Sequence, residues 1–270
     1  MDARAVFAPE LFRDQVVLVT GGGTGIGFQI ARELGHLGAA VVIAARSRER
    51  LERATADLRE EGIAARWQTV NIRKEDEVSA LFDALAAQES LPDILVNNAG
   101  GQFMSAAIDI SARGFRAVID LNLNGTWYMS HAFARHAIAR GAGGRIINIV
   151  LPVENGVPCY AHAAAARAAV INLTKTLAVE WARHGITVNS VAPGTIRTPG
   201  LDQYDPRRIE RAISILPIKR IGEPLEVARC VAFFASPAGD YITGTTLLVD
   251  GGGHLARPLD DDQPGPGRDT

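Results

Sequence analysis

The sequence predicts a single-domain α/β protein built on a doubly wound parallel sheet. Three observations lead to this fold class. Short β-branched runs alternate with longer stretches of helical periodicity, which is the pattern of repeated strand–helix–strand units. A glycine-rich turn separates the first expected strand from the first expected helix. The chain has 270 residues, of which 47% are hydrophobic, and this is enough for one such unit with a large core.

Seven short runs are the expected strands. Most of them are apolar on both faces, as the strands of a buried parallel sheet should be. They are residues 16–20, 40–44, 66–70, 94–97, 145–150, 187–191 and 246–250.

Apolar residues at helical spacing predict amphipathic helices between these strands. One such stripe consists of Val78, Leu81, Phe82 and Leu85, and a second consists of Val170, Leu173, Leu177, Ala178 and Trp181. We expect the folded domain to span residues 14–256, after an N-terminal extension over 1–13. Residues 257–270 are rich in Asp, Pro and Gly without apolar anchors, so we expect a disordered tail.

Composition argues against several classes of function. The 28 Lys and Arg residues nearly balance the 30 Asp and Glu residues, so no strong field favours nucleic acid or anionic lipid. Cys159 and Cys230 are far apart and belong to no metal-ligand motif, which indicates neither a disulfide framework nor a metal site. No apolar run is long enough to span a membrane. We therefore expect a cytoplasmic protein that acts on a small molecule.

The turn Thr20-Gly21-Gly22-Gly23-Thr24-Gly25-Ile26-Gly27 predicts a dinucleotide site of the Rossmann type. Glycines let the backbone approach a diphosphate, which then lies on the free amides and the positive end of the following helix. A glycine cluster alone is weak evidence, but its place between strand and helix favours binding over a simple turn. The expected contacts are Gly21, Thr24, Gly25, Ile26 and Gly27.

The end of the second expected strand favours NADPH over NADH. An NAD-selective site usually has an acidic residue there to bind the ribose 2′-hydroxyl. This chain has Arg46 and Ser47 instead, and a guanidinium can pair with the 2′-phosphate while the hydroxyl donates to it.

These motifs, with three others, resemble the short-chain dehydrogenase/reductase family from about residue 14 to about residue 253. The others are Asn97-Asn98-Ala99-Gly100, Asn122-Leu123-Asn124-Gly125 and Pro193-Gly194-Thr195-Ile196-Arg197-Thr198. The resemblance implies cofactor contacts as well as a homo-oligomer, a tetramer or dimer. Asn71 and Ile72 would flank the adenine, although the family more often has Asp at position 71. The other implied cofactor contacts are Asn98, Ala99, Gly100, Pro193, Gly194, Ile196 and Thr198.

Within the family, residues 71–73, 97–103 and 148–167 look most like trans-2-enoyl-CoA reductases of the peroxisomal type, with 2,4-dienoyl-CoA reductases as near relatives. An acyl-CoA substrate is therefore implied. Family members also place a helix over the substrate after the Pro-Gly motif. Here that segment is 200–216, whose Tyr204, Ile209, Ile213 and Leu216 would line an acyl site or pack inward.

The chain departs from the family at its catalytic pair, Tyr-x-x-x-Lys. The register places Ala163 at the tyrosine and Arg167 at the lysine, and the usual serine falls near Leu151 or Pro152. Ketone reduction needs a positioned acid for the alkoxide oxygen. Reduction of a double bond conjugated to a thioester mainly needs a hydrogen-bond donor at the thioester oxygen, so the loss of the tyrosine favours enoyl reduction.

The candidates for catalytic roles are Asn122, Tyr160 and Arg167. Tyr160 precedes the vacant position by three residues, and Arg167 would also hold the cofactor ribose. We leave His162 out, because a lone histidine at a helix start is more often structural. The leading hypothesis is an NADPH-dependent reductase of an enoyl-CoA-like thioester. Two alternatives stay open: a carbonyl reductase or alcohol dehydrogenase that uses Tyr160 as its acid, and a catalytically silent NADP(H)-binding protein.

Overall fold

The computed structural model describes residues 6–203 and 206–255. Its centre is a seven-stranded sheet in the order β3-β2-β1-β4-β5-β6-β7, and every neighbouring pair is parallel. The strands are β1 (Val16–Thr20), β2 (Ala40–Ala45), β3 (Ala65–Thr69), β4 (Ile94–Asn97), β5 (Gly144–Ile149), β6 (Ile186–Pro193) and β7 (Thr246–Val249). The strand order reverses between β1 and β4, which is where open parallel sheets bind ligands. The predicted fold class is confirmed.

All seven expected strands are present, and their ends differ from the expected ones by a residue or two. The third and fifth strands begin and end one residue earlier than expected, and β6 extends to Pro193. Strand ends depend on hydrogen bonds to the neighbouring strand, which the sequence does not reveal. The amide of Val70, for example, still donates to the Ala45 carbonyl although Val70 lies beyond β3.

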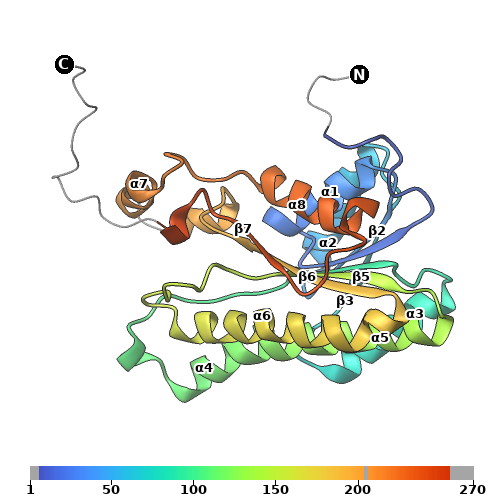
Figure 1. The fold of residues 1–270 in the computed structure, drawn as a ribbon, viewed down its shortest axis with the longest axis horizontal. Helices are drawn as coiled ribbons and strands as arrows, with labels where there is room; N and C mark the ends of the chain where they lie inside the picture. Colours follow the sequence, from blue (N-terminus) through green and yellow to red (C-terminus); the bar gives the residue numbers. More distant parts are fainter. Residues whose placement is uncertain (1–5, 204–205, 256–270) are drawn as a thin grey trace.

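Helices cover both faces of the sheet (Figure 1). They are α1 (Gly25–His36), α2 (Arg48–Glu60), α3 (Glu75–Ala87), α4 (Ala112–Ile119), α5 (Gly125–Arg140), α6 (Ala161–Trp181), α7 (Pro206–Ile215) and α8 (Pro224–Ala235). One core cluster joins α1, α2 and α8 to the sheet, and a second joins α3, α5 and α6 to its other face. The predicted stripe on α3 is buried along its whole length, because it faces this second cluster.

The described part of the expected N-terminal extension packs on the domain. Phe12 is fully buried, and its amide donates to the Leu37 carbonyl at 2.8 Å. The tail that we expect to be disordered, 257–270, lies outside the described residues, and so does Tyr204. Within the described ranges, no helix has the length and apolar character needed to cross a membrane.

Candidate active site

The glycine turn presents the start of α1 to an anion. Gly21 and Gly25 have φ angles of +67° and +56°, a region that glycine enters at little cost. Thr24 precedes the helix and, among the described residues, makes no capping hydrogen bond with its side chain, and the first turn holds no acidic residue. The first amides and the positive end of the helix dipole are therefore available to a diphosphate.

Thr20 and Asn98 join the turn to the segment after β4. The Thr20 hydroxyl donates to the Val96 carbonyl and accepts the amides of Asn98 and Ala99, both at 3.0 Å. The Asn98 amide group donates to the Thr20 carbonyl at 2.9 Å. Gly27 packs so closely on Asn98 that a Cβ there would overlap its side chain. The glycine turn and the segment 98–100 are thus joined by hydrogen bonds and close packing, and together they form one wall of the site.

A cavity of about 710 Å³ lies against this wall and has the size of a cofactor site. Most of the residues predicted to bind the dinucleotide line it. They are Gly21, Thr24, Gly25, Ile26, Gly27, Arg46, Ser47, Asn71, Ile72, Asn98, Ala99, Gly100 and Thr198. The uncapped helix start, the glycine turn and two arginines that line the cavity fit a nicotinamide dinucleotide.

Two arginines line this cavity, Arg46 and Arg50. Both are exposed, and neither makes an ion pair with another described residue. Ser47 accepts the Arg50 amide at 3.4 Å and so caps α2. Arg50 was not among the residues predicted to bind the cofactor. The signal was present, since a serine cap at position 47 places residue 50 in the first turn of the helix that follows Arg46.

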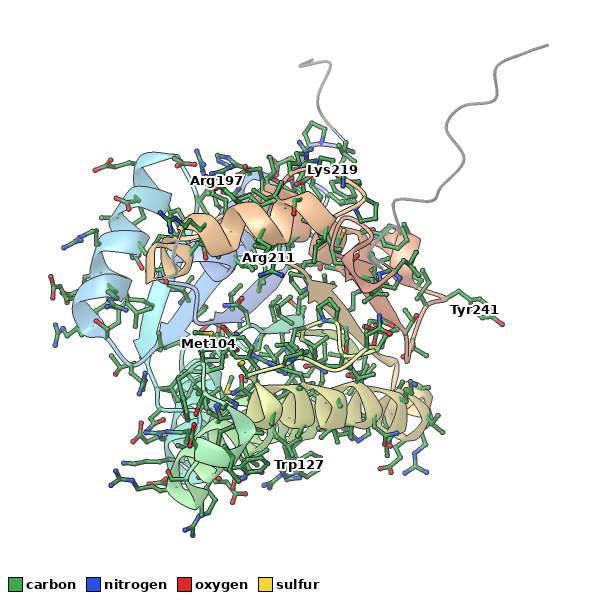
Figure 2. The ribbon with its side chains drawn as sticks, turned by 90° about the vertical axis from the view of Figure 1, so that its left-hand side faces the viewer. Met104, Trp127, Arg197, Arg211, Lys219 and Tyr241 are labelled. Carbon is green, nitrogen blue, oxygen red and sulfur yellow. The ribbon has the colours of Figure 1, made fainter. Side chains whose placement is uncertain are left out.

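A second cavity, of about 590 Å³, adjoins the first, and Ile26, Thr198 and Gly200 line both. Its walls are mainly apolar. Six further residues predicted to belong to the site line it: Tyr160, Pro193, Gly194, Ile196, Ile209 and Leu216. Leu151 and Pro152, which stand where the family has its serine, also line it. In Figure 2, α7 crosses the upper part of the view with Arg211 labelled on it, and Met104 is labelled below the helix.

The two positions of the missing Tyr-x-x-x-Lys pair both lie on the buried side of α6. Ala163 is 1% exposed and has no proton to offer. The Arg167 guanidinium donates to the Ile149 carbonyl at 2.8 Å. Burial lowers the pKa of Arg167 to about 10, so it stays cationic at neutral pH. Arg167 lies behind Gly100 and lines neither cavity directly, so its contact with the ribose stays a prediction.

Asn122 is hydrogen-bonded to the segment that follows β4. It lies in a π-helical turn between α4 and α5, an irregularity that often marks functional sites. Its side chain is fully buried, donates to the carbonyls of Gly101 and Val118 at 2.8 Å, and accepts the Gly101 amide. Asn122 therefore positions the segment after β4, and a more direct part in catalysis stays a prediction.

Tyr160 is the residue immediately before α6 and lines the second cavity. His162, two residues later, is buried, and its ring meets the Phe103 ring edge-on at 4.4 Å. Burial lowers the pKa of His162. Because His162 lines neither cavity, the packing agrees with leaving it out of the site.

An Asp–His pair that the sequence analysis missed lies in the second cavity. Asp250 follows β7, and its carboxylate is 2.9 Å from Nδ1 of His254. It also accepts the amides of His254 and Gly252. Burial acts to raise the pKa of Asp250, but these hydrogen bonds outweigh it and lower the pKa. The spacing Asp-x-x-x-His after the last strand was the available signal.

The fold and the two adjoining cavities define a nicotinamide-dinucleotide-dependent oxidoreductase. A family model described as enoyl-(acyl carrier protein) reductase matches residues 21–254. The chain belongs to the short-chain dehydrogenase/reductase family.

Individual relatives narrow the comparison. The peroxisomal 2,4-dienoyl-CoA reductase [(3E)-enoyl-CoA-producing] of Arabidopsis thaliana is 38% identical, over 93% of this chain and 88% of that protein. The probable 2,4-dienoyl-CoA reductase [(2E)-enoyl-CoA-producing] of Bacillus subtilis (strain 168) is 35% identical, over 88% and 96%. The solved structure of a citronellol catabolism dehydrogenase from Pseudomonas aeruginosa PAO1 is 36% identical with a TM-score of 0.84, over 93% and 99%. The predicted resemblance is confirmed.

Proposed function

We propose that this protein is an NADPH-dependent reductase of a carbon–carbon double bond conjugated to a thioester, with an enoyl-CoA or 2,4-dienoyl-CoA as substrate. The observation that carries the proposal is Ala163. It fills the place of the family's acid, and its side chain cannot protonate a carbonyl oxygen. The relatives named 2,4-dienoyl-CoA reductases support the same chemistry.

In this proposal the first cavity binds the dinucleotide and the second binds the acyl substrate. The amides at the start of α1 would hold the diphosphate, and Arg46 and Arg50 would hold the 2′-phosphate, which supports NADPH over NADH. A nicotinamide dinucleotide held by these residues would supply the hydride. Apolar walls from Leu201, Ile209 and Leu216 would exclude water from the acyl chain. Tyr160 would donate a hydrogen bond to the thioester oxygen as it gains charge.

A carbonyl reductase is the second candidate, because Tyr160 has a hydroxyl and lines the substrate cavity. One assay separates the two. Purified protein is mixed with NADPH and, in parallel, with a trans-2-enoyl-CoA, a 2,4-dienoyl-CoA and a 3-ketoacyl-CoA, and absorbance at the nicotinamide band is followed. We expect turnover of an unsaturated thioester. Turnover of the ketone alone would replace our proposal by the carbonyl reductase, and tight NADPH binding without any turnover would indicate the silent binder.

We also propose a homo-oligomer and the cytoplasm as its compartment. Phe115, Trp127 and Val179 are large apolar side chains that are 38%, 36% and 80% exposed on α4, α5 and α6, and Trp127 is seen at this surface in Figure 2. Burial of such side chains favours association. Light scattering after size-exclusion chromatography would test the oligomeric state.

The proposed compartment rests on the cysteines. Both are free thiols, which supports a reducing compartment.

A further inference from the structure

Reduction of a conjugated thioester requires a proton at the α-carbon, and the proposed function leaves the donor of that proton unassigned. Ala163 has none. The Arg167 guanidinium packs against Gly100, and Arg167 lines neither cavity. Because Tyr160 is assigned to the thioester oxygen in the proposed function, another titratable side chain that lines the second cavity is the candidate for this proton.

The Asp250–His254 pair meets the geometric requirements. Both residues line the cavity that contains Tyr160. Asp250 also lies directly against the Pro-Gly motif, because a Cβ added at Gly194 would come within 2.7 Å of the Asp250 Cβ. Thr198, which lines both cavities, belongs to the same Pro-Gly motif, so the pair packs against the segment that joins the two cavities.

The hydrogen bonds of the pair fix which ring nitrogen is available. An ionised carboxylate only accepts hydrogen bonds, so Nδ1 of His254 carries the proton shared with Asp250. Nε2 is then left for exchange with a substrate, as in other carboxylate–histidine pairs. The backbone of the pair is also held, because the His254 amide donates to Asp250 at 2.7 Å and the Asn155 side chain donates to the His254 carbonyl.

Several charged groups lie around the pair. Asp250 faces the His254 ring directly, and its lowered pKa keeps it ionised at neutral pH. Glu154 also lines the second cavity. Arg220 and Glu226 line a neighbouring cavity together with Asp250 and His254, and they form a salt bridge of 2.7 Å with each other. The side chain of His254 is 23% exposed, so it can recover a proton from water.

We propose that His254 is the general acid that protonates the α-carbon of the reduced thioester, and that Asp250 is its positioning residue. This inference rests on the proposed function. In the step, the Nε2–H bond of the imidazolium breaks and a C–H bond forms at the α-carbon, with the electron pair of the enolate. The imidazole becomes neutral and takes its next proton from solvent.

The experiment uses the full chain with NADPH and the unsaturated thioester that the wild type turns over, in D₂O. We expect wild-type product to carry deuterium on one face of the α-carbon. His254→Gln should lower kcat about 100-fold or more, as removal of a general acid does, and its product should carry deuterium on both faces. His36→Gln is the matched control, since His36 is exposed at the end of α1 and lines neither cavity.

Two further measurements separate an acid from a structural group. The NADPH dissociation constant should change less than about threefold in His254→Gln, and added imidazole should restore turnover to His254→Ala. Asp250→Asn should lower kcat more than it changes KM. A His254→Gln enzyme with wild-type kcat and single-face deuterium would overturn the assignment while leaving the reductase intact. A wild type that turns over no unsaturated thioester would overturn both.

Discussion

The guanidinium of Arg167 occupies the space beside Gly100 that a side chain at position 100 would need. A Cβ built on Gly100 would overlap Nη2 of Arg167 and would lie 2.7 Å from the Asn122 side-chain oxygen. The two residues come from α6 and from the loop after β4, 67 positions apart in the chain. Position 100 must therefore stay a glycine as long as position 167 is an arginine.

The first prediction follows from this packing. Gly100→Ala should lower the free energy of unfolding by about 1–3 kcal/mol, because neither backbone nor guanidinium can move freely in the core. Urea unfolding measures it. Gly101→Ala is the control, since its Cβ would meet only the flexible end of Leu121 at 3.3 Å. In a double-mutant cycle, Arg167→Ala should recover part of the loss; strictly additive effects would argue against the overlap.

The second prediction concerns coenzyme choice. Arg46→Asp should weaken NADPH binding by about 10- to 100-fold, because a hydrogen bond to a charged group contributes about 1.5–3 kcal/mol, and it should improve NADH binding. Arg50→Ala should weaken NADPH in the same direction and leave NADH unchanged. Fluorescence titration with both coenzymes measures the ratio.

The neighbouring arginine supplies the control for coenzyme choice. Arg48 bonds to Glu52 at 2.8 Å, lies over the Trp67 ring at 5.4 Å, and does not line the cavity. Arg48→Ala should leave the NADPH/NADH ratio as it is. An equal loss of NADPH affinity in all three variants would indicate a general loss of positive charge instead of a specific phosphate site.

The third prediction compares two buried threonines. The hydroxyl of Thr20 makes three hydrogen bonds, so Thr20→Val should lower the free energy of unfolding by about 1–3 kcal/mol. It should also weaken dinucleotide binding, because the wall loses its connection to the glycine turn. The hydroxyl of Thr55 has no partner among the described residues, so Thr55→Val should be neutral or stabilising. Chemical unfolding of both variants checks the contrast, and equal losses would contradict it.

The fourth prediction is a pH dependence of stability at the start of α8. The hydrogen bond from Arg220, followed by the amide of Glu223, lowers the pKa of Glu226 to about 2 from its ordinary 4.5. A lowered folded-state pKa means that the contribution is complete above pH 4.5 and is lost as pH falls toward 2. The pair is half-exposed, so we expect about 1 kcal/mol or less.

Glu226→Gln tests this dependence. The difference in unfolding free energy between wild type and variant should be present at pH 7 and should shrink below pH 4.5. Glu180→Gln is the control, because Glu180 is exposed on α6 and forms no ion pair within the described ranges. A difference that does not change with pH would show that the carboxylate charge is not responsible.

Local pattern was enough to predict most of the fold and the dinucleotide side of the site. Strand and helix periodicity, the glycine turn and the absence of a tyrosine at position 163 are all properties of short segments, and chain connectivity in a parallel sheet then follows from few allowed topologies. Arg50 shows the limit of such reading. Its cap at Ser47 was visible in the sequence, but its place in the cavity depends on the direction in which α2 leaves β2.

The motifs of the chain were sufficient to predict a dinucleotide site and to show that the family's usual acid is missing at position 163. The surroundings of position 163 could be known only from the folded chain. Arg167 is buried because α6 turns it toward Gly100. Asp250 and His254 line the same cavity as Tyr160, although about 90 residues of the chain lie between Tyr160 and this pair. Parallel strands end at the same edge of the sheet, so side chains that follow β5, β6 and β7 meet there whatever their distance in sequence.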